Sequence, residues 1–250
     1  MAKNKSIFKI EGTLDEVTFY KGADGYLIRK KGGVSKNRIM NDPAFIRTRE
    51  NGTEFGVAAQ NGKLIRNAFT QMVKNAKDNK LVARLTQRIL LVKNFDDSSV
   101  RGMRNLRVGL LSDQGKLVLN GFEFNGNTSL TTILKTPFVA SIEEGSITLT
   151  NFVPSEHLVI SGGATHIKLK AAVSLINFVT NQHQTIYADE VLLPLNNTLI
   201  EMVELKVSEI PEGEGSLIQT FSIEFLQSLN GIFYGLKNGM HNPMSIVSLK

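Results

Sequence analysis

Residues 29–69, RKKGGVSKNRIMNDPAFIRTRENGTEFGVAAQNGKLIRNAF, are the stretch around which the rest of the chain is organised. Asp42 followed by Pro43 predicts a helix start, because an aspartate side chain caps free backbone amides and proline suits the first helical position. Apolar residues then recur at three- and four-residue steps from Phe55 to Val73, which predicts an amphipathic helix. Asn51-Gly52-Thr53 predicts an interruption of this helix, since glycine costs about 1 kcal/mol relative to alanine in a helix interior.

Upstream of this stretch, three short segments alternate apolar and polar residues, as the strands of a half-buried sheet do. They are Ser6–Ile10, Glu16–Tyr20 and Tyr26–Lys30, and glycine-containing turns separate them. The sequence therefore predicts a small antiparallel hairpin unit, which by its size needs something to pack against. Gly32-Gly33 then leads into residues 34–41, which we predict to be an exposed basic connector.

Downstream of the stretch, a second amphipathic helix is predicted from about Asp78 to Val92. Beyond Asp113 the pattern changes to many short strand-like segments separated by turns, including a turn at residues 237–239, and this spacing is typical of a β-sandwich. The strand-like segments are residues 116–120, 122–125, 130–134, 138–142, 147–152, 157–160, 166–179, 185–193, 199–208, 217–226, 231–236 and 244–249.

The predicted fold class is therefore α+β. An N-terminal hairpin plus helical basic module would occupy residues 1–113, and a C-terminal antiparallel β-sandwich would occupy residues 114–250.

Charge is distributed very unevenly along the chain. Residues 1–110 hold 22 Lys and Arg against 10 Asp and Glu, whereas residues 111–250 hold 7 against 13. The net charge of +6 is thus the sum of a front part at +12 and a back part at −6. Every arginine lies at or before Arg107. Such a chain is suited to bind something negative through its front part.

Composition excludes several classes of protein. The absence of cysteine excludes disulfides, thiolate zinc sites and a cysteine nucleophile. No apolar run reaches the ~20 residues that span a bilayer, so no membrane span is expected. The first residues show no signal-peptide pattern. We expect synthesis in the cytoplasm, with a virion as a destination consistent with the function considered below.

Motifs that carry chemistry are not found. The four histidines have no spacing that would place two of them on one helix face, and no nucleophile elbow, P-loop or dinucleotide fingerprint occurs. Asp96-Asp97 and Glu143-Glu144 are adjacent pairs, which point to opposite sides of an extended chain and make poor acid/base dyads. We therefore predict a protein that is not an enzyme, with no cofactor, no metal and no small-molecule substrate.

The basic part is the remaining functional signal. Arginine and lysine clusters bind acidic protein surfaces and phosphates by the same physics, although such clusters also serve simply as a solvated surface. The predicted interface or anion-binding residues are Arg29, Lys30, Lys31, Lys36, Arg38, Arg47, Arg49, Arg66, Arg101, Arg104 and Arg107. The predicted acidic counterpart consists of Glu201, Glu204, Glu209, Glu212 and Glu214.

The segment from Gly12 to Phe55 resembles the start of uncharacterised bacterial and prophage-type proteins. The residues that carry the likeness are VTFYKGADGYLIRKKGG, residues 17–33, and DPAFIRTRENGTEFG, residues 42–56. In those proteins a short hairpin and a basic, proline-started helix precede a β-rich remainder. The resemblance implies a phage-like or secreted-assembly structural protein and names no activity.

Three hypotheses for function follow. The first is a self-assembling structural subunit, a homo-oligomer such as a virion or filament component, in which the connector Arg29–Arg49 contacts the acidic surface of a neighbouring copy. The alternative is a nucleic-acid-binding protein with its basic half on phosphates. A third, a sandwich that binds carbohydrate, is disfavoured by the absence of tryptophan.

Overall fold

A computed structural model describes residues 2–3, 9–236 and 241–250 of the chain. The described residues contain helices and antiparallel strands in largely separate stretches of the chain, so the predicted mixed α+β class is confirmed. The chain divides into two compact units, Met1–Arg49 and Glu50–Lys250. The strand predicted at Ser6–Ile10 and the turn predicted at residues 237–239 lie largely or wholly outside the described residues.

The N-terminal unit contains a small antiparallel sheet followed by short helices. Its elements are β1 (Ala2–Lys3), β2 (Gly12–Leu14), β3 (Val17–Gly22), β4 (Gly25–Lys30), α1 (Lys36–Asn41) and the 3-10 turn η1 (Pro43–Phe45). The strand order is β1-β4-β3-β2. Residues 34–41, predicted as a connector, include the helix α1, which begins because the Ser35 side chain accepts a hydrogen bond from the Arg38 amide.

The helix start predicted at Asp42-Pro43 is confirmed. The Asp42 carboxylate accepts the Ala44 amide at 2.9 Å, and η1 leads directly into α2 (Ile46–Ala68). The predicted interruption at residues 51–53 is wrong, because α2 continues through Gly52 without a break. Buried residues on the following turns, among them Ala58 and Ile65, hold the helix in place and outweigh the modest cost of one glycine.

The second unit contains α2 and further helices, most of them short. These are α3 (Thr70–Ala76), α4 (Leu81–Val92), the 3-10 turn η2 (Lys93–Phe95), α5 (Leu106–Gly109), α6 (Asp113–Leu119), α7 (Leu130–Ile133) and α8 (Pro154–His157). The strands are β5 (Val139–Ser141), β6 (Ser146–Phe152), β7 (His166–Asn177), β8 (Gln182–Tyr187), β9 (Val191–Pro194), β10 (Ile200–Lys206), β11 (Ser216–Leu229), β12 (Ile232–Gly235) and β13 (Met244–Leu249).

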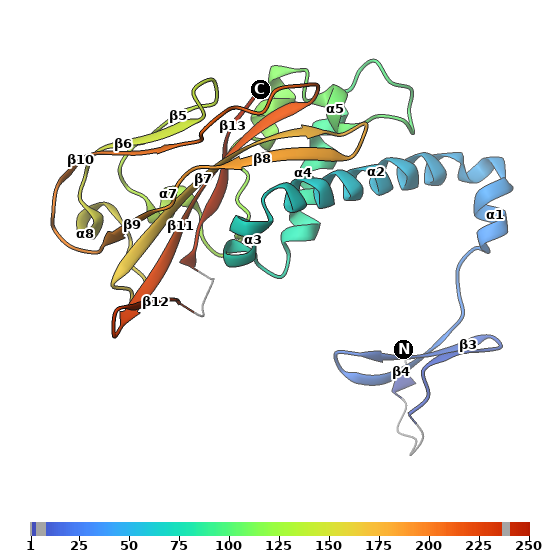
Figure 1. Ribbon diagram of the computed structural model, residues 1–250. Coiled ribbons are helices and arrows are strands. Elements are labelled where there is room, and N and C mark those ends of the chain that lie inside the picture. The colour runs from blue at the N-terminus through green and yellow to red at the C-terminus, as the bar shows by residue number, and fades with distance from the viewer. Residues whose placement is uncertain (1, 4–8, 237–240) are drawn as a thin grey trace. The chain divides into compact units, whose positions relative to one another are not determined.

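These strands form two antiparallel sheets. The larger sheet has the order β12-β11-β7-β8, with β13 paired to β11 and β9 paired to β7 (Figure 1). The smaller sheet has the order β10-β6-β5, so β10 and β5 are its edge strands. The long strands β7 and β11 are paired along their length, from Ser216 opposite Ile176 to Leu226 opposite His166.

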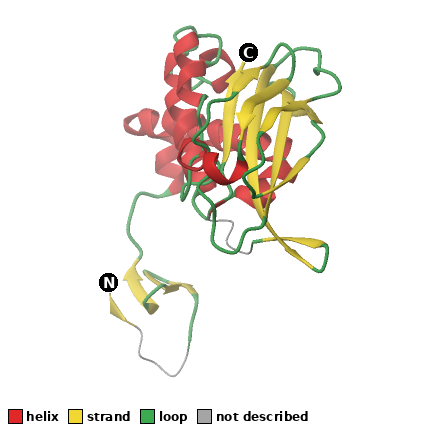
Figure 2. Ribbon diagram, turned by 90° about the vertical axis from the view of Figure 1, so that its left-hand side faces the viewer, coloured by secondary structure: helices red, strands yellow, loops and turns green. Residues whose placement is uncertain are grey.

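Each face of the larger sheet packs against a different layer. On one face, β7 residues Ala172 and Ile176 join a core with residues of α2, α3, α4 and α6. On the other face, Ile167, Leu169 and Val173 join a second core with the inward residues of the small sheet. Helices therefore cover one face of the larger sheet and a smaller sheet covers the other, and Figure 2 shows the helices beside the strands.

The first of these cores bears on the domain boundary predicted at residue 113. It joins residues on both sides of that position, such as Leu85 and Ile246. Residues 50–113 therefore share their core with the strands. The division between the two compact units falls instead after Arg49.

Three segments predicted as strands include short helices. Residues 116–119 belong to α6, residues 130–133 form α7, and α8 ends at His157. Serine caps explain the first two, since the Ser112 hydroxyl accepts the Gly115 amide at 2.9 Å and the Ser129 hydroxyl accepts the Thr132 amide at 3.1 Å. A helix of one or two turns has too few residues for its periodicity to be distinguished from that of a strand.

Candidate functional site

The basic residues predicted to form an interface fall into three groups, and the largest lies in the N-terminal unit. Arg29, Lys30, Lys31, Lys36, Arg38 and Arg47 are exposed on β4, α1, the segment between them and the start of α2. The guanidinium of Arg29 lies 5.3 Å from the centre of the Tyr20 ring. The ammonium group of Lys30 lies 3.3 Å from the carboxylate of Glu16, an exposed pair of small energetic weight.

Two arginines of this group also hold the local backbone. Arg49 donates from Nη1 to the carbonyl oxygens of Ile39 at 2.7 Å and Asp42 at 3.0 Å. Arg38 donates from Nε to the Asp42 carboxylate at 3.1 Å. The hydrogen bond from the Ala44 amide, and then that from Arg38, hold the pKa of Asp42 below its usual value. These contacts fix α1 against the start of α2.

The N-terminal unit has no buried side chain between residues 9 and 49. Its sheet nevertheless carries apolar and aromatic residues on two neighbouring strands. Phe19 lies opposite Ile28, and Tyr20 lies opposite Leu27. All four side chains are only half-buried. These strands therefore have apolar surface that the described residues of the unit do not cover.

The second group consists of Arg101, Arg104 and Arg107, in α5 and the segment that leads to it. Arg101 and Arg104 form ion pairs within the chain. Arg101 forms an ion pair with Glu50 at 3.4 Å. Arg104 donates from Nε to Glu54 Oε1 at 3.1 Å, and Glu54 is only 2% exposed. Lys93 also forms an ion pair with Glu54, and the Gly102 amide donates to the same carboxylate at 2.8 Å.

Glu54 remains ionised despite its burial. Desolvation alone would raise its pKa, but the hydrogen bonds from Lys93, the Gly102 amide and Arg104 outweigh it and lower the pKa to about 2. Lys93 and Arg104 thus share one carboxylate inside the protein, whose single negative charge offsets one of their two positive charges. The sequence did not reveal this pairing, because Glu54 and Arg104 come together only through the fold.

The third group is a single arginine, Arg66, in the last turn of α2. Its side chain is half-buried, and its Nη1 atom is buried. Burial lowers the pKa of Arg66 below its ordinary value. A guanidinium in this position has little access to a partner, so Arg66 belongs more to the helix packing than to an open surface.

The predicted acidic residues are brought together on one stretch of surface. Glu201 and Glu204 are exposed on β10, and Glu209, Glu212 and Glu214 are exposed in the segment between β10 and β11. Within the part of the chain that the structure describes, none of these five forms an ion pair. Their charges face solvent.

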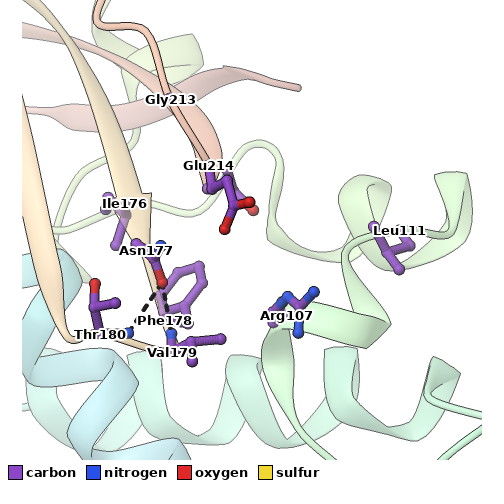
Figure 3. A pocket seen from close by; sticks show the side chains of 11 residues that line it. Arg107, Leu111, Ile176, Asn177, Phe178, Val179, Thr180, Gly213 and Glu214 are labelled. Atoms are coloured by element: carbon purple, nitrogen blue, oxygen red, sulfur yellow. Dashed lines mark hydrogen bonds between the residues drawn. The ribbon is translucent and has the colours of Figure 1, made fainter.

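One pocket brings a predicted basic residue and a predicted acidic residue to the same place. Arg107 and Glu214 line a pocket of about 500 Å³ with Leu111 and residues 176–180 (Figure 3). Asn177 Oδ1 accepts the amides of Val179 and Thr180 at 2.9 and 3.0 Å, which shapes the turn at its floor. The opposed charges of Arg107 and Glu214 leave no net charge there to select an ionic ligand.

A charged network on the larger sheet could not be predicted from the sequence. Lys170 lies 3.0 Å from both Glu190 and Glu224, and Lys168 lies 2.7 Å from Glu190. Asn75 donates to Glu224 at 3.0 Å. Burial alone would lower the pKa of Lys170, but the two carboxylates raise it above its usual value. A lysine held in its charged form is a poor nucleophile, so the network fits a structural role.

A second missed group is Glu123, which lies between α6 and α7. Its Oε1 atom accepts the Leu130 amide at 2.9 Å, whereas its Oε2 atom is buried and meets no hydrogen-bond partner among the described residues. Burial raises the pKa of Glu123 to about 7, against the opposing effects of the Leu130 amide and Arg84. The sequence offers no signal for this shift, because it depends on the packing around the carboxylate.

No group of three or more histidine, aspartate or glutamate side chains is placed to hold a metal ion among residues 2–3, 9–236 and 241–250. No helix in those same ranges is both long enough and apolar enough to cross a bilayer.

Comparison with known proteins gives no relative. The chain matches no protein-family model, no curated protein and no solved structure.

Proposed function

We propose that this chain is a non-enzymatic structural subunit that assembles with copies of itself, as a virion or filament component does. In this proposal the N-terminal unit of one copy contacts the acidic surface of Glu201, Glu204, Glu209, Glu212 and Glu214 on another copy. The larger and smaller sheets, with the core between them, act as the rigid sandwich body of the subunit.

The observation that carries this proposal is the lack of a buried side chain in residues 9–49 of the N-terminal unit. Residues 9–49 include a sheet with aromatic and aliphatic side chains, yet none of these side chains is buried. Small sheets are stable only when a hydrophobic face packs against something else. A unit that remains part of the folded protein therefore needs a partner surface.

Charge supports another copy as that partner. Residues 9–49 hold nine Lys and Arg against five Asp and Glu, whereas residues 201–214 hold five glutamates and a single lysine. Complementary surfaces of this kind steer association and fix its orientation. Because the two surfaces differ, the contact is head-to-tail, and such contacts build rings or filaments.

The experiment is light scattering coupled to size exclusion, at low and high salt, over a range of protein concentrations. We expect oligomers that grow with concentration and that weaken as salt screens the charges. An electron micrograph of the same sample should show rings or filaments. A monomer at every salt and concentration contradicts the proposal.

One observation favours nucleic acid as the second candidate partner. Arg29 lies over Tyr20, and the Lys9 ammonium group lies 5.8 Å from the centre of the Tyr26 ring. Cations interleaved with aromatic rings are typical of surfaces that bind single-stranded nucleic acids. Titration with single-stranded DNA and RNA tests this candidate, and the affinity should fall steeply with salt if phosphates are bound.

A further inference from the structure

The register of the N-terminal sheet places five of its apolar and aromatic residues on one face, and Tyr20 and Leu27 on the other. Residues directly opposite each other in an antiparallel pair share a face, and Phe19 lies opposite Ile28 while Leu14 lies opposite Val17. Tyr26 lies on this same face, opposite Lys21. We call this face, made of Leu14, Val17, Phe19, Tyr26 and Ile28, the donor face.

Lysines stand at both ends of the donor face. Lys21 closes one end beside Tyr26, and Lys30 closes the other end opposite Val17. The side chain of Leu14 is 71% exposed, and the remaining apolar side chains of the face are half-buried. The other face of the sheet carries Thr13, Thr18 and Arg29 together with Tyr20 and Leu27, so it has fewer apolar side chains. The donor face is thus an apolar patch between two cations.

The small sheet of the second unit offers a surface with the matching character. Its inward residues belong to the second core, so the alternate residues point outward. Val139, Thr148 and Glu204 lie side by side across β5, β6 and β10, and Thr150 lies opposite Met202 in the same register. We call these five residues the acceptor face.

The acceptor face has exposed apolar side chains and negative charge, as a surface that contacts another sheet would. Val139 and Met202 are 69% and 61% exposed, which is unusual for apolar side chains on a sheet. Glu204 and the neighbouring Glu201 supply negative charge, and Lys206 is the one cation on β10. Two sheets can pack face to face through such surfaces.

We propose that the donor face of one copy packs on the acceptor face of a second copy, with Lys21 and Lys30 near Glu201 and Glu204. This contact rests on the proposed function and names the surfaces that perform it. The apolar centre provides the stability of the contact, and the charges at its rim provide orientation. Because each copy carries one donor and one acceptor face, the assembly grows head to tail.

The test uses one charged substitution on each face, with a matched control for each. Phe19→Glu alters the donor face, and Thr18→Glu alters the adjacent residue on the opposite face. Met202→Glu alters the acceptor face, and Val100→Glu alters a residue of similar exposure outside it. Sedimentation velocity then gives the size of each variant, alone and in mixtures.

We expect Phe19→Glu and Met202→Glu each to weaken assembly by at least about tenfold, since each buries a charge in an apolar contact. Thr18→Glu and Val100→Glu should assemble as the unaltered protein does. A mixture of Phe19→Glu and Met202→Glu has one intact donor and one intact acceptor face. It should form a one-to-one dimer that does not grow, which misfolded variants would not do.

The possible results separate a wrong choice of faces from a failure of self-assembly itself. If Phe19→Glu and Met202→Glu assemble as well as the unaltered protein, the two faces are not the contact, while the proposed function survives. If both are monomeric and their mixture forms no dimer, the faces do not meet and this inference fails. If the unaltered protein is itself monomeric at every concentration, the proposed function fails as well.

A charge exchange gives an independent measurement of the same contact. Lys21→Glu and Glu204→Lys should each weaken assembly by about two- to fivefold, as expected for exposed ion pairs. The two changes in one chain should restore it, because the charges are then exchanged. If the double variant assembles more weakly than either single variant, by the sum of their two effects, the proposed arrangement is wrong.

Discussion

Glu54 is a buried carboxylate of the second unit and is only 2% exposed. Three donors converge on its carboxylate, from Lys93, Arg104 and the Gly102 amide. Breaking a buried ion pair by removing one partner costs about 3–5 kcal/mol, because the other charge is left uncompensated. We therefore expect Glu54→Gln to lower the free energy of unfolding by about 3 kcal/mol or more, as measured by urea denaturation at neutral pH.

The matched control for this variant is Glu50→Gln. Glu50 forms an ion pair with the half-exposed side chain of Arg101, in which the two groups are separated by 3.4 Å. Pairs of this kind contribute up to about 1 kcal/mol. If Glu50→Gln is as damaging as Glu54→Gln, burial is not the reason for the effect.

The same residue predicts how stability depends on acid. The pKa of Glu54 falls from an ordinary value of 4.5 to about 2 on folding. A lowered carboxyl pKa stabilises the folded state above the unfolded value, and this stability is lost as the pH falls from about 5 towards 2. The unaltered protein should lose stability over this range more steeply than Glu54→Gln. Parallel curves would show that Glu54 is not the group responsible.

Glu123 predicts the opposite dependence. Its pKa is raised to about 7 by burial, so the folded state holds a proton that the unfolded state releases near pH 4.5. The stability of the unaltered protein should therefore decline between about pH 4.5 and 7. Between about pH 4.5 and 7, the free energy of unfolding of Glu123→Gln should rise by roughly 1 kcal/mol relative to that of the unaltered protein. This figure is smaller than the full pKa shift would give, because the carboxyl is only partly buried. If the difference in free energy of unfolding between Glu123→Gln and the unaltered protein is the same at pH 5 and pH 8, this prediction is wrong.

At the scale of the element, α2 makes a prediction that depends on its continuity. Gly52 and Gly56 lie in the helix interior, and a Cβ at either position would meet no atom within 4 Å. Gly52→Ala should therefore raise the free energy of unfolding by about 0.5–1 kcal/mol. If the chain were interrupted at residues 51–53, alanine would bring no such gain.

A glycine in α6 gives the contrasting case. A Cβ at Gly115 would overlap the carbonyl oxygen of Gly109, so the close approach of α5 and α6 requires glycine there. Gly115→Ala should lower the free energy of unfolding by about 1–3 kcal/mol, as overpacking does. Gly56→Ala is the matched control in the same unit. Equal effects at the two positions would argue against the packing described.

Several elements could be predicted from the sequence, and others could not. The long strands β7 and β11, the helix α4 and the Asp42 cap follow from periodicity and capping alone. The helices α6 and α7 do not, because their few residues follow no decisive period and their serine caps resemble turns. The sequence also could not show that α2 continues through Gly52, since tertiary packing decides this.

For the candidate surfaces, the sequence indicated which residues carry charge but not which charges remain available. All five predicted glutamates are exposed. Arg104, in contrast, pairs with Glu54, and this pairing needs the fold to bring residues 50 positions apart into contact. The donor face could not be predicted at all without the strand register, which places Phe19 opposite Ile28.

For the chain as a whole, the exposure of residues 9–49 and the separate acidic surface predict that folding of the N-terminal unit depends on assembly. The N-terminal unit has no buried side chain between residues 9 and 49, and the opposite charge gathers on β10 and the segment after it. A segment whose described side chains are all at least partly exposed is stabilised by what it binds, so assembly and folding of residues 9–49 are expected to be linked. Dilution should therefore expose residues 9–49 to proteolysis sooner than the second unit.

The most direct measurement of self-assembly is sedimentation velocity of the unaltered protein over a wide range of concentrations at two ionic strengths. We expect species larger than the monomer, whose proportion rises with concentration and falls as salt is added. A single monomeric species at every concentration and both ionic strengths would contradict it.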